Sequence, residues 1–149
     1  MIRKIPIPDD SRIYRREFYE FCCNKVVTVF SSLKEIISVY RFGSIKALGN
    51  SDIDFIFVVK KKNGIGNLIK DIFLSNFSNT EKYIVFQHDP MLLTENLIPY
   101  VYYIRAPSNL KLLYGKDFHI NKNLNRQISY MQLAELIIAY SDSLELKNV

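Results

Sequence analysis

The chain has 149 residues, of which 48% are hydrophobic and 13% aromatic, and a formal net charge of +5 from 20 basic and 15 acidic residues. These values indicate one globular domain over residues 1–149 and exclude a disordered chain. The chain has no apolar run of membrane-spanning length, no secretion signal and no Cys spacing that suits a disulfide framework. We therefore expect a cytoplasmic protein without membrane association.

Helical spacing of apolar residues marks both ends of the chain. After Ser11, a residue type that favours helix starts, the spacing predicts a long N-terminal helix over about residues 11–34. A C-terminal helix is predicted over about residues 124–146. The apolar stripe that we expect it to bury consists of Leu133, Leu136, Ile137, Tyr140 and Leu144. Met131 and Ile138 lie beside that stripe and widen the apolar face.

Short β-rich runs between these helices predict a sheet. The expected strands are residues 35–42, 53–59, 83–87 and 110–114, and the expected shorter helices are residues 66–77 and 98–105. The run Ile53–Val59 is almost continuously apolar, as in a strand that is covered on both faces. The order of elements indicates an α/β (α+β) fold with a small mixed central β-sheet flanked by helices.

The stretch RFGSIKALGNSDIDFIFVV, residues 41–59, carries the chemistry. Residues two apart on a strand face the same way, so Asp52 and Asp54 would project together. Two carboxylates that close repel each other unless a cation lies between them, and their oxygens suit Mg²⁺ or Mn²⁺. Gly43 lets the backbone approach a phosphate, and Ser44 can open a short helix whose N–H groups bind that anion. The stretch therefore predicts a metal site and a phosphate site together, as nucleotidyl transfer requires.

Either motif alone is common in loops, but an aspartate directly before FIFVV has no packing reason. The combination of FGS at residues 42–44 and SDIDFIFVV at residues 51–59 resembles the DNA polymerase beta-like nucleotidyltransferase superfamily. It looks most like the minimal nucleotidyltransferases and the N-terminal domain of aminoglycoside nucleotidyltransferases. The resemblance implies a nucleotidyltransferase fold. It also implies the site residues: Gly43 and Ser44 on the nucleotide phosphates, and Asp52 and Asp54 on two Mg²⁺ (or Mn²⁺) ions.

Active members of that superfamily usually carry a third carboxylate at the next strand, where it binds the catalytic metal and can act as base. In the relatives this acid usually comes just before the apolar run, and with a strand at residues 83–87 that position favours Glu81. Asp89 is the alternative, although it also suits a turn before Pro90. Without a third acid, the chain would be a nucleotide-binding or partner-binding relative with little activity.

The resemblance implies an enzyme that transfers NMP from an NTP, with ATP as the expected donor, to an acceptor hydroxyl of a small molecule, an RNA or a protein. Arg41 and Lys46 flank the Gly-Ser pair and are further candidates for phosphate contact. One alternative is a catalytically weak module that binds a small helical protein, as one half of a toxin–antitoxin pair does. Another is a domain that grips nucleic acid without chemistry. Because only one helix follows the sheet, we expect acceptor binding to come from a partner or from a longer protein.

Overall fold

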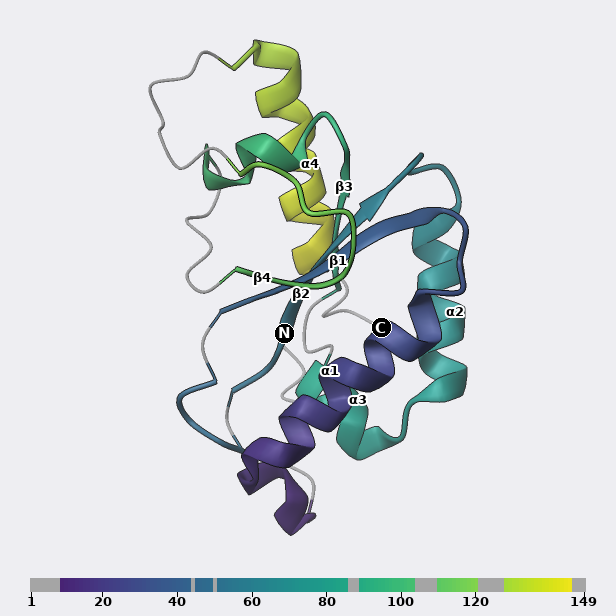
Figure 1. Ribbon diagram of the computed structural model, residues 1–149, viewed down its shortest axis with the longest axis vertical. Helices are drawn as coiled ribbons and strands as arrows, with labels where there is room; N and C mark the ends of the chain where they lie inside the picture. The colour runs from purple at the N-terminus through teal and green to yellow at the C-terminus, as the bar shows by residue number, and fades with distance from the viewer. Residues whose placement is uncertain are drawn as a thin grey trace.

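The computed structural model describes residues 9–43, 45–49, 51–85, 89–103, 110–120 and 128–145 (Figure 1). Its elements in chain order are η1 (Ser11–Tyr14), α1 (Arg16–Phe30), β1 (Ile36–Phe42), β2 (Asp54–Val59), α2 (Ile65–Asn76), α3 (Asn79–Val85), β3 (Met91–Thr94), η2 (Ile98–Tyr103), β4 (Lys111–Gly115) and α4 (Tyr130–Glu145). The expected α/β class, with a mixed sheet flanked by helices, is confirmed.

The sheet has 4 strands in the order β3-β2-β1-β4. β1 pairs antiparallel with both β2 and β4, whereas β2 and β3 run parallel. The parallel pair is joined through α2 and α3, as parallel strands need a crossover. β2 lies inside the sheet and is buried from its second residue onward, which confirms the expectation from its continuous apolar run.

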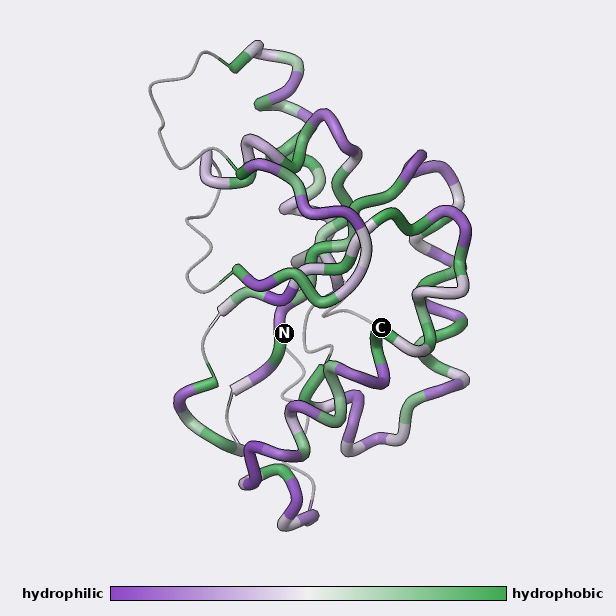
Figure 2. Tube along the Cα trace, viewed as in Figure 1, coloured by the Kyte–Doolittle hydropathy of each residue, from purple (hydrophilic) through white to green (hydrophobic). Residues whose placement is uncertain are grey.

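Helices cover both faces of this sheet. Figure 1 shows α1, α2 and α3 on one side and α4 on the other, and Figure 2 shows hydrophobic residues concentrated along the strands between them. Because side chains alternate along a strand, β2 contributes to both cores. Phe55 and Phe57 pack toward α1 and α2, while Ile56 and Val58 pack toward η2 and α4.

The long N-terminal helix expected over residues 11–34 is divided. The 3-10 helix η1 comes first, capped by the side chain of Asp10, which accepts a hydrogen bond from Arg12 N at 3.0 Å. Arg15 then has an extended backbone, with φ −114° and ψ 130°, and interrupts the helical path before α1 begins. The expectation of one continuous helix was therefore wrong at its first turn.

The strand expected over residues 83–87 was also wrong. Tyr83–Val85 belong to helix α3, and residues 86 and 87 lie outside the described residues. The cause is a capping box at the helix start, since Ser78 N donates to Glu81 Oε2 at 2.6 Å and Glu81 N donates to Ser78 Oγ at 3.3 Å. The next strand is β3, which had not been expected.

The remaining expectations hold in part. The strand over residues 110–114 is β4, and the helix over residues 98–105 is the 3-10 helix η2 as far as Tyr103. The final helix begins at Tyr130, because Ser129 and Gln132 form a second capping box with both hydrogen bonds at 3.2 Å. Residues 104, 105, 124–127 and 146 of the expected ranges lie outside the described residues.

The expected buried stripe of α4 is narrower in the structure. Leu136 is buried together with Ala139, and Leu133 and Tyr140 are half-buried. Ile137 was expected in the core but exposes 50% of its surface. The burial of Leu144 lies outside what the structure describes. Across the described ranges, no helix is long and apolar enough to span a membrane.

Candidate functional site

The two halves of the Gly-Ser and Asp-x-Asp stretch meet where β1 ends and β2 begins. The antiparallel register pairs Phe42 with Asp54, which brings Gly43 beside that aspartate. Gly43 has φ +87°, a left-handed conformation that favours glycine. A Cβ at Gly43 would lie 3.4 Å from Oδ2 of Asp54. The Asp54 carboxylate therefore lies within ordinary van der Waals range of the place that a side chain at residue 43 would occupy. Ser44, the other half of the predicted phosphate site, lies outside the described residues.

Asp52 and Asp54 lie on either side of an anchored residue. Ile53 is buried in the core on the α1 side, and its backbone N–H donates to the carbonyl of Ile84 in α3 at 2.8 Å. Both aspartates are half-buried, so solvent and a small ligand can reach them. Because β2 begins at Asp54, the strand alternation expected to align the two side chains does not extend to Asp52. The hydrogen-bonded loop before β2 positions Asp52.

That loop is folded back on itself between β1 and β2. Ser51 N donates to the Ala47 carbonyl at 2.7 Å, and Ala47 N donates to Ser51 Oγ at 3.1 Å. Gly49, at its tip, is buried and has φ +86°. Figure 1 shows the loop reaching the start of α1. Sequence reasoning missed this role of Gly49, because the contacts that bury it come from distant helices.

Glu81, the favoured third acid, lies in a different setting. It is only 7% exposed, and Lys25 Nζ of α1 donates to both of its carboxylate oxygens at 2.9 Å. Lys25 also lies 5.0 Å from the centre of the Phe77 ring. Burial opposes ionisation of Glu81, but the hydrogen bonds from Lys25 and Ser78 outweigh it and lower its pKa. The carboxylate thus joins α3 to α1 and caps α3.

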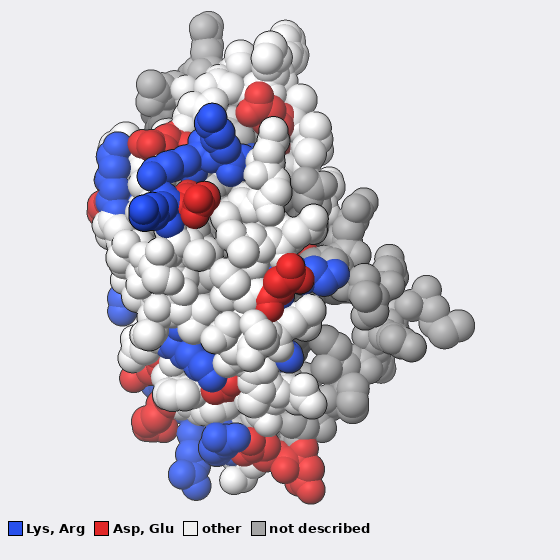
Figure 3. Space-filling view, turned by 90° about the vertical axis from the view of Figure 1, so that its right-hand side faces the viewer, with Lys and Arg blue, Asp and Glu red and all other residues white. Residues whose placement is uncertain are grey.

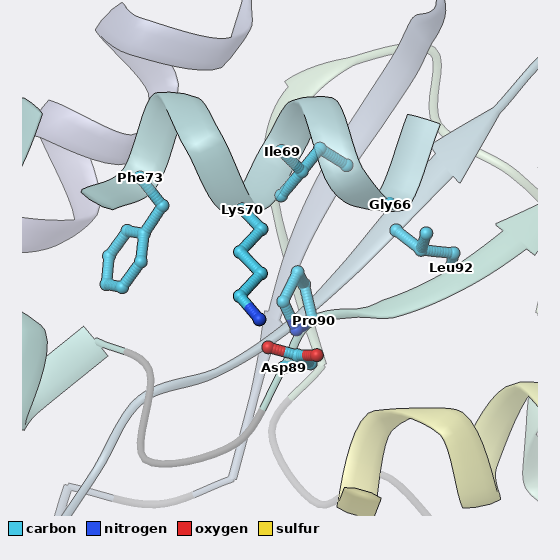
Figure 4. A pocket seen from close by; sticks show the side chains of 7 residues that line it. All are labelled: Gly66, Ile69, Lys70, Phe73, Asp89, Pro90 and Leu92. Atoms are coloured by element: carbon cyan, nitrogen blue, oxygen red, sulfur yellow. The ribbon is translucent and has the colours of Figure 1, made fainter. Parts of the chain in front are cut away.

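Asp89, the alternative third acid, precedes the strand that neighbours β2. The parallel register begins with Ile56 opposite Met91, so Asp89 lies two residues before β3, at the same end of the sheet as Asp54. Burial raises the pKa of Asp89 to about 6, although the charge of Lys70 opposes this. In Figure 4, Lys70 from α2 and Asp89 point toward one another in a cleft whose other walls are mostly apolar.

The basic residues near the site are distributed differently from the expectation. Arg41 lies on the α1 side of the sheet, close to Cys23, whose pKa is raised by burial and lowered in part by the Arg41 charge. Asp54 belongs to the alternation that faces α4, so Arg41 and Asp54 lie on opposite faces. Lys46 is exposed on the loop. On the face drawn in Figure 3, basic and acidic side chains are interspersed, unlike the single-sign tracks that bind nucleic acids.

The donor set for a cation is the pair of aspartates. Among the described residues, no three His, Cys, Asp or Glu side chains gather closely enough to hold a metal ion. Asp52 and Asp54 nevertheless supply the hard carboxylate oxygens that Mg²⁺ and Mn²⁺ prefer, and Gly43 lies beside Asp54. These residues fit a weakly held cation that a phosphate ligand would help to bind.

Comparison with models of protein families, with curated proteins and with solved structures gives no match. The geometry of Gly43, Asp52 and Asp54 is therefore the basis on which a function can be inferred. Two half-buried carboxylates, one of them beside a glycine with positive φ, suit the binding of a metal and an anion together.

Proposed function

We propose that this chain is a nucleotidyltransferase that uses Mg²⁺ or Mn²⁺ to transfer NMP from an NTP, with ATP as the expected donor, to an acceptor hydroxyl. The observation that carries the proposal is the meeting of Gly43 and Asp54 at the paired ends of β1 and β2. It supports the proposal because a phosphate that approaches the Gly43 backbone also approaches the carboxylate that would hold the cation.

In the proposed reaction, the acceptor oxygen attacks the α-phosphorus of the NTP. A new P–O bond forms while the bond between the α- and β-phosphates breaks, pyrophosphate leaves, and the hydroxyl proton passes to a carboxylate. Gly43 binds phosphate through its backbone together with Ser44, and Asp52 and Asp54 hold the cation. When bound, the metal neutralises phosphate charge and orients the groups for in-line displacement.

Asp89 is our proposal for the carboxylate that accepts the proton. It precedes β3, the parallel neighbour of β2, at the end of the sheet where Asp54 begins β2, and its raised pKa of about 6 suits proton uptake near neutral pH. In the structure Asp89 faces Lys70 in the cleft against α2, whereas Asp54 lies on the face toward α4, so the proposed reaction requires Asp89 to leave that cleft and approach Asp54. Glu81, favoured by the sequence, is held by Lys25 and Ser78 on a helix, which makes it the weaker candidate.

A partner-binding module is the second candidate function, and the exposed face of α4 favours it. Met131 exposes 75% of its surface and Ile138 exposes 57%, next to the half-exposed Ile137. A small helical protein, as in one half of a toxin–antitoxin pair, would cover such a face. In that case the chain would bind nucleotide weakly or not at all, and acceptor recognition would belong to the complex.

The test is calorimetric binding of ATP, GTP, CTP and UTP, with Mg²⁺ and with EDTA, to the wild type, Asp54→Asn and Asp71→Asn. Asp71 is exposed on α2 and undergoes the same change of charge, so it controls for general electrostatic effects. We expect metal-dependent binding of at least one NTP that Asp54→Asn abolishes and Asp71→Asn retains. Asp54→Asn makes the chain more positive, so repulsion of the NTP cannot explain a loss.

Absence of binding of every NTP to the wild type would overturn the enzyme proposal and favour the partner-binding module. Equal binding to the wild type and Asp54→Asn would place the nucleotide elsewhere on the chain. Binding that EDTA does not affect would remove the metal from the proposal.

A further inference from the structure

Gly49 is held on three sides by tyrosines. Its backbone N–H donates to the hydroxyl of Tyr19 at 2.9 Å, and its carbonyl accepts from the hydroxyl of Tyr83 at 3.2 Å. The ring of Tyr14 covers the remaining side, since a Cβ at Gly49 would lie 2.4 Å from a Tyr14 ring carbon. A side chain at residue 49 would have to displace the Tyr14 ring, and the φ of +86° independently favours glycine at this position.

Tyr19 makes a second bond to the same loop. Its hydroxyl donates to the carbonyl of Ser51 at 3.0 Å, so one phenol links Gly49 and Ser51. Tyr19 is fully buried, which means that these backbone groups depend on the phenol rather than on solvent. The phenol fixes the shape of the chain immediately before Asp52.

Helix α3 holds the other side of Asp52. The carbonyl of Ile84 accepts a hydrogen bond from Ile53 N at 2.8 Å, and the neighbouring Tyr83 reaches Gly49. Asp52 is thus the single residue between Ser51, held from α1, and Ile53, held from α3. Burial raises the pKa of Tyr19, and the charge of Asp52 is among the smaller causes, which places phenol and carboxylate within electrostatic reach.

We propose that Tyr19 and Tyr83 are positioning residues for the metal site: their hydroxyls hold Gly49 and Ser51 and thereby place Asp52 to bind a cation together with Asp54. The inference rests on the proposed function, because it assigns these tyrosines a part in that same site. Two carboxylates repel each other, and an unrestrained loop would let Asp52 move away before a cation arrives. When the loop is held in place beforehand, binding of the cation does not include the free-energy cost of bringing the two carboxylates together.

The test compares Mn²⁺ binding by electron paramagnetic resonance to the wild type, Tyr19→Phe, Tyr83→Phe and Tyr114→Phe. Tyr114 is the matched control, because its hydroxyl also donates to a backbone carbonyl, that of Ser31 at 3.2 Å, far along the chain from the loop. We expect Tyr19→Phe to lower the affinity for Mn²⁺ about tenfold, which is the effect of removing groups that orient metal ligands. Tyr83→Phe removes one hydrogen bond to the loop, so it should lower the Mn²⁺ affinity by less. Tyr114→Phe should leave the Mn²⁺ affinity unchanged.

A double-mutant cycle separates positioning from general stability. If Tyr19 acts through Asp52, Tyr19→Phe should have little further effect on Mn²⁺ affinity in an Asp52→Asn background. Each variant is measured where circular dichroism shows it fully folded. Tyr83→Phe provides the same test should Tyr19→Phe fail to fold.

The outcomes distinguish this inference from the function on which it rests. Equal Mn²⁺ affinity of the wild type and both tyrosine variants would overturn the positioning role and leave the metal site intact. Additive effects of Tyr19→Phe and Asp52→Asn would also overturn it, since the tyrosine would then act elsewhere. A wild type that binds no Mn²⁺ would overturn the metal site and the positioning role together.

Discussion

Two carboxylate regions of this molecule were expected from the sequence to serve one site, and they differ in what surrounds them. Asp52 and Asp54 lie half-buried where β1 ends and β2 begins, with Gly43 beside Asp54. Glu81 lies buried between α3 and α1, with both oxygens bonded by Lys25. The charge of Glu81 is neutralised inside the fold, whereas the aspartates face a surface that a ligand can reach. The comparison teaches that a carboxylate's surroundings, more than its place in a motif, indicate whether it serves binding or stability.

The largest expected effect is the loss of nucleotide binding when Asp54 is changed. We expect Asp54→Asn to weaken Mg²⁺-dependent NTP binding at least about 100-fold, or about 2.7 kcal/mol. Its free energy of unfolding should change by less than about 0.5 kcal/mol, because the side chain is half-buried. Calorimetry and urea unfolding measure the two quantities on the same sample. A variant that loses stability and binding in parallel would make Asp54 a structural residue like Glu81.

The second largest expected effect is the loss of stability, with nucleotide binding retained, when Glu81 is changed. We expect Glu81→Gln to lower the free energy of unfolding by about 2 kcal/mol, since it leaves Lys25 without its buried counter-charge and weakens the cap of α3. Nucleotide binding should persist. Glu95→Gln is the control, because the Glu95–Lys116 ion pair at 3.1 Å is exposed and should contribute less than about 0.5 kcal/mol. Selective loss of metal-dependent binding in Glu81→Gln would restore Glu81 as the third acid.

Two glycines, Gly43 and Gly64, allow a test of the proposed phosphate site. Gly43 and Gly64 both have positive φ, +87° and +75°, so alanine at either should cost about 1–2 kcal/mol in backbone strain. Only at Gly43 would the new Cβ meet a carboxylate, because nothing lies within 4 Å of the corresponding position at Gly64. We therefore expect both variants to lose similar stability in urea unfolding. Only Gly43→Ala should lose NTP affinity, and an equal loss in Gly64→Ala would show that strain alone explains the result.

Much of the central sheet could be predicted from the sequence, because its signals are local. β1 and β2 follow from apolar runs, and their short connection favours the antiparallel pairing that brings Gly43 to Asp54. β3 has 4 residues and follows a turn-like Asp-Pro, so its run was too short to identify. The segment YIVFQ has high β-propensity, yet the capping box at Ser78 starts a helix there. That box was readable in the sequence and was overlooked.

The surroundings of the candidate site could not be predicted in the same way. The hydrogen bond from Gly49 to Tyr19 spans 30 residues, and the bond from Lys25 to Glu81 spans 56. Such contacts depend on how helices pack on the sheet, and no local pattern encodes them. Sequence alone identified the chemical groups, whereas the fold determined that Lys25 bonds Glu81 and that distant helices hold the residues on both sides of Asp52.

The smallest expected effect concerns Asp89, whose pH dependence should run opposite to that of Glu81. Burial raises the pKa of Asp89 to about 6, above its unfolded value of about 3.9, so the folded state binds the extra proton. Its ionisation therefore destabilises the fold progressively as pH rises from about 4 to 6. At pH 7, Asp89→Asn should raise the free energy of unfolding by less than about 1 kcal/mol, because it removes this charge. Below about pH 4 the stability gained by Asp89→Asn should vanish.

Glu81 has a lowered pKa, so its contribution is present above its unfolded value of about 4.3 and is lost as pH falls. Urea unfolding of the wild type, Asp89→Asn and Glu81→Gln between pH 3.5 and 7.5 (a range chosen to bracket about 4 to 6) measures both trends. If Asp89 joins Asp54 when the site is loaded, Mn²⁺ should also displace the Asp89 proton and lower its pKa. A Mn²⁺-independent pKa at Asp89 would confine this residue to the cleft beside Lys70 and leave the proposed reaction without its base.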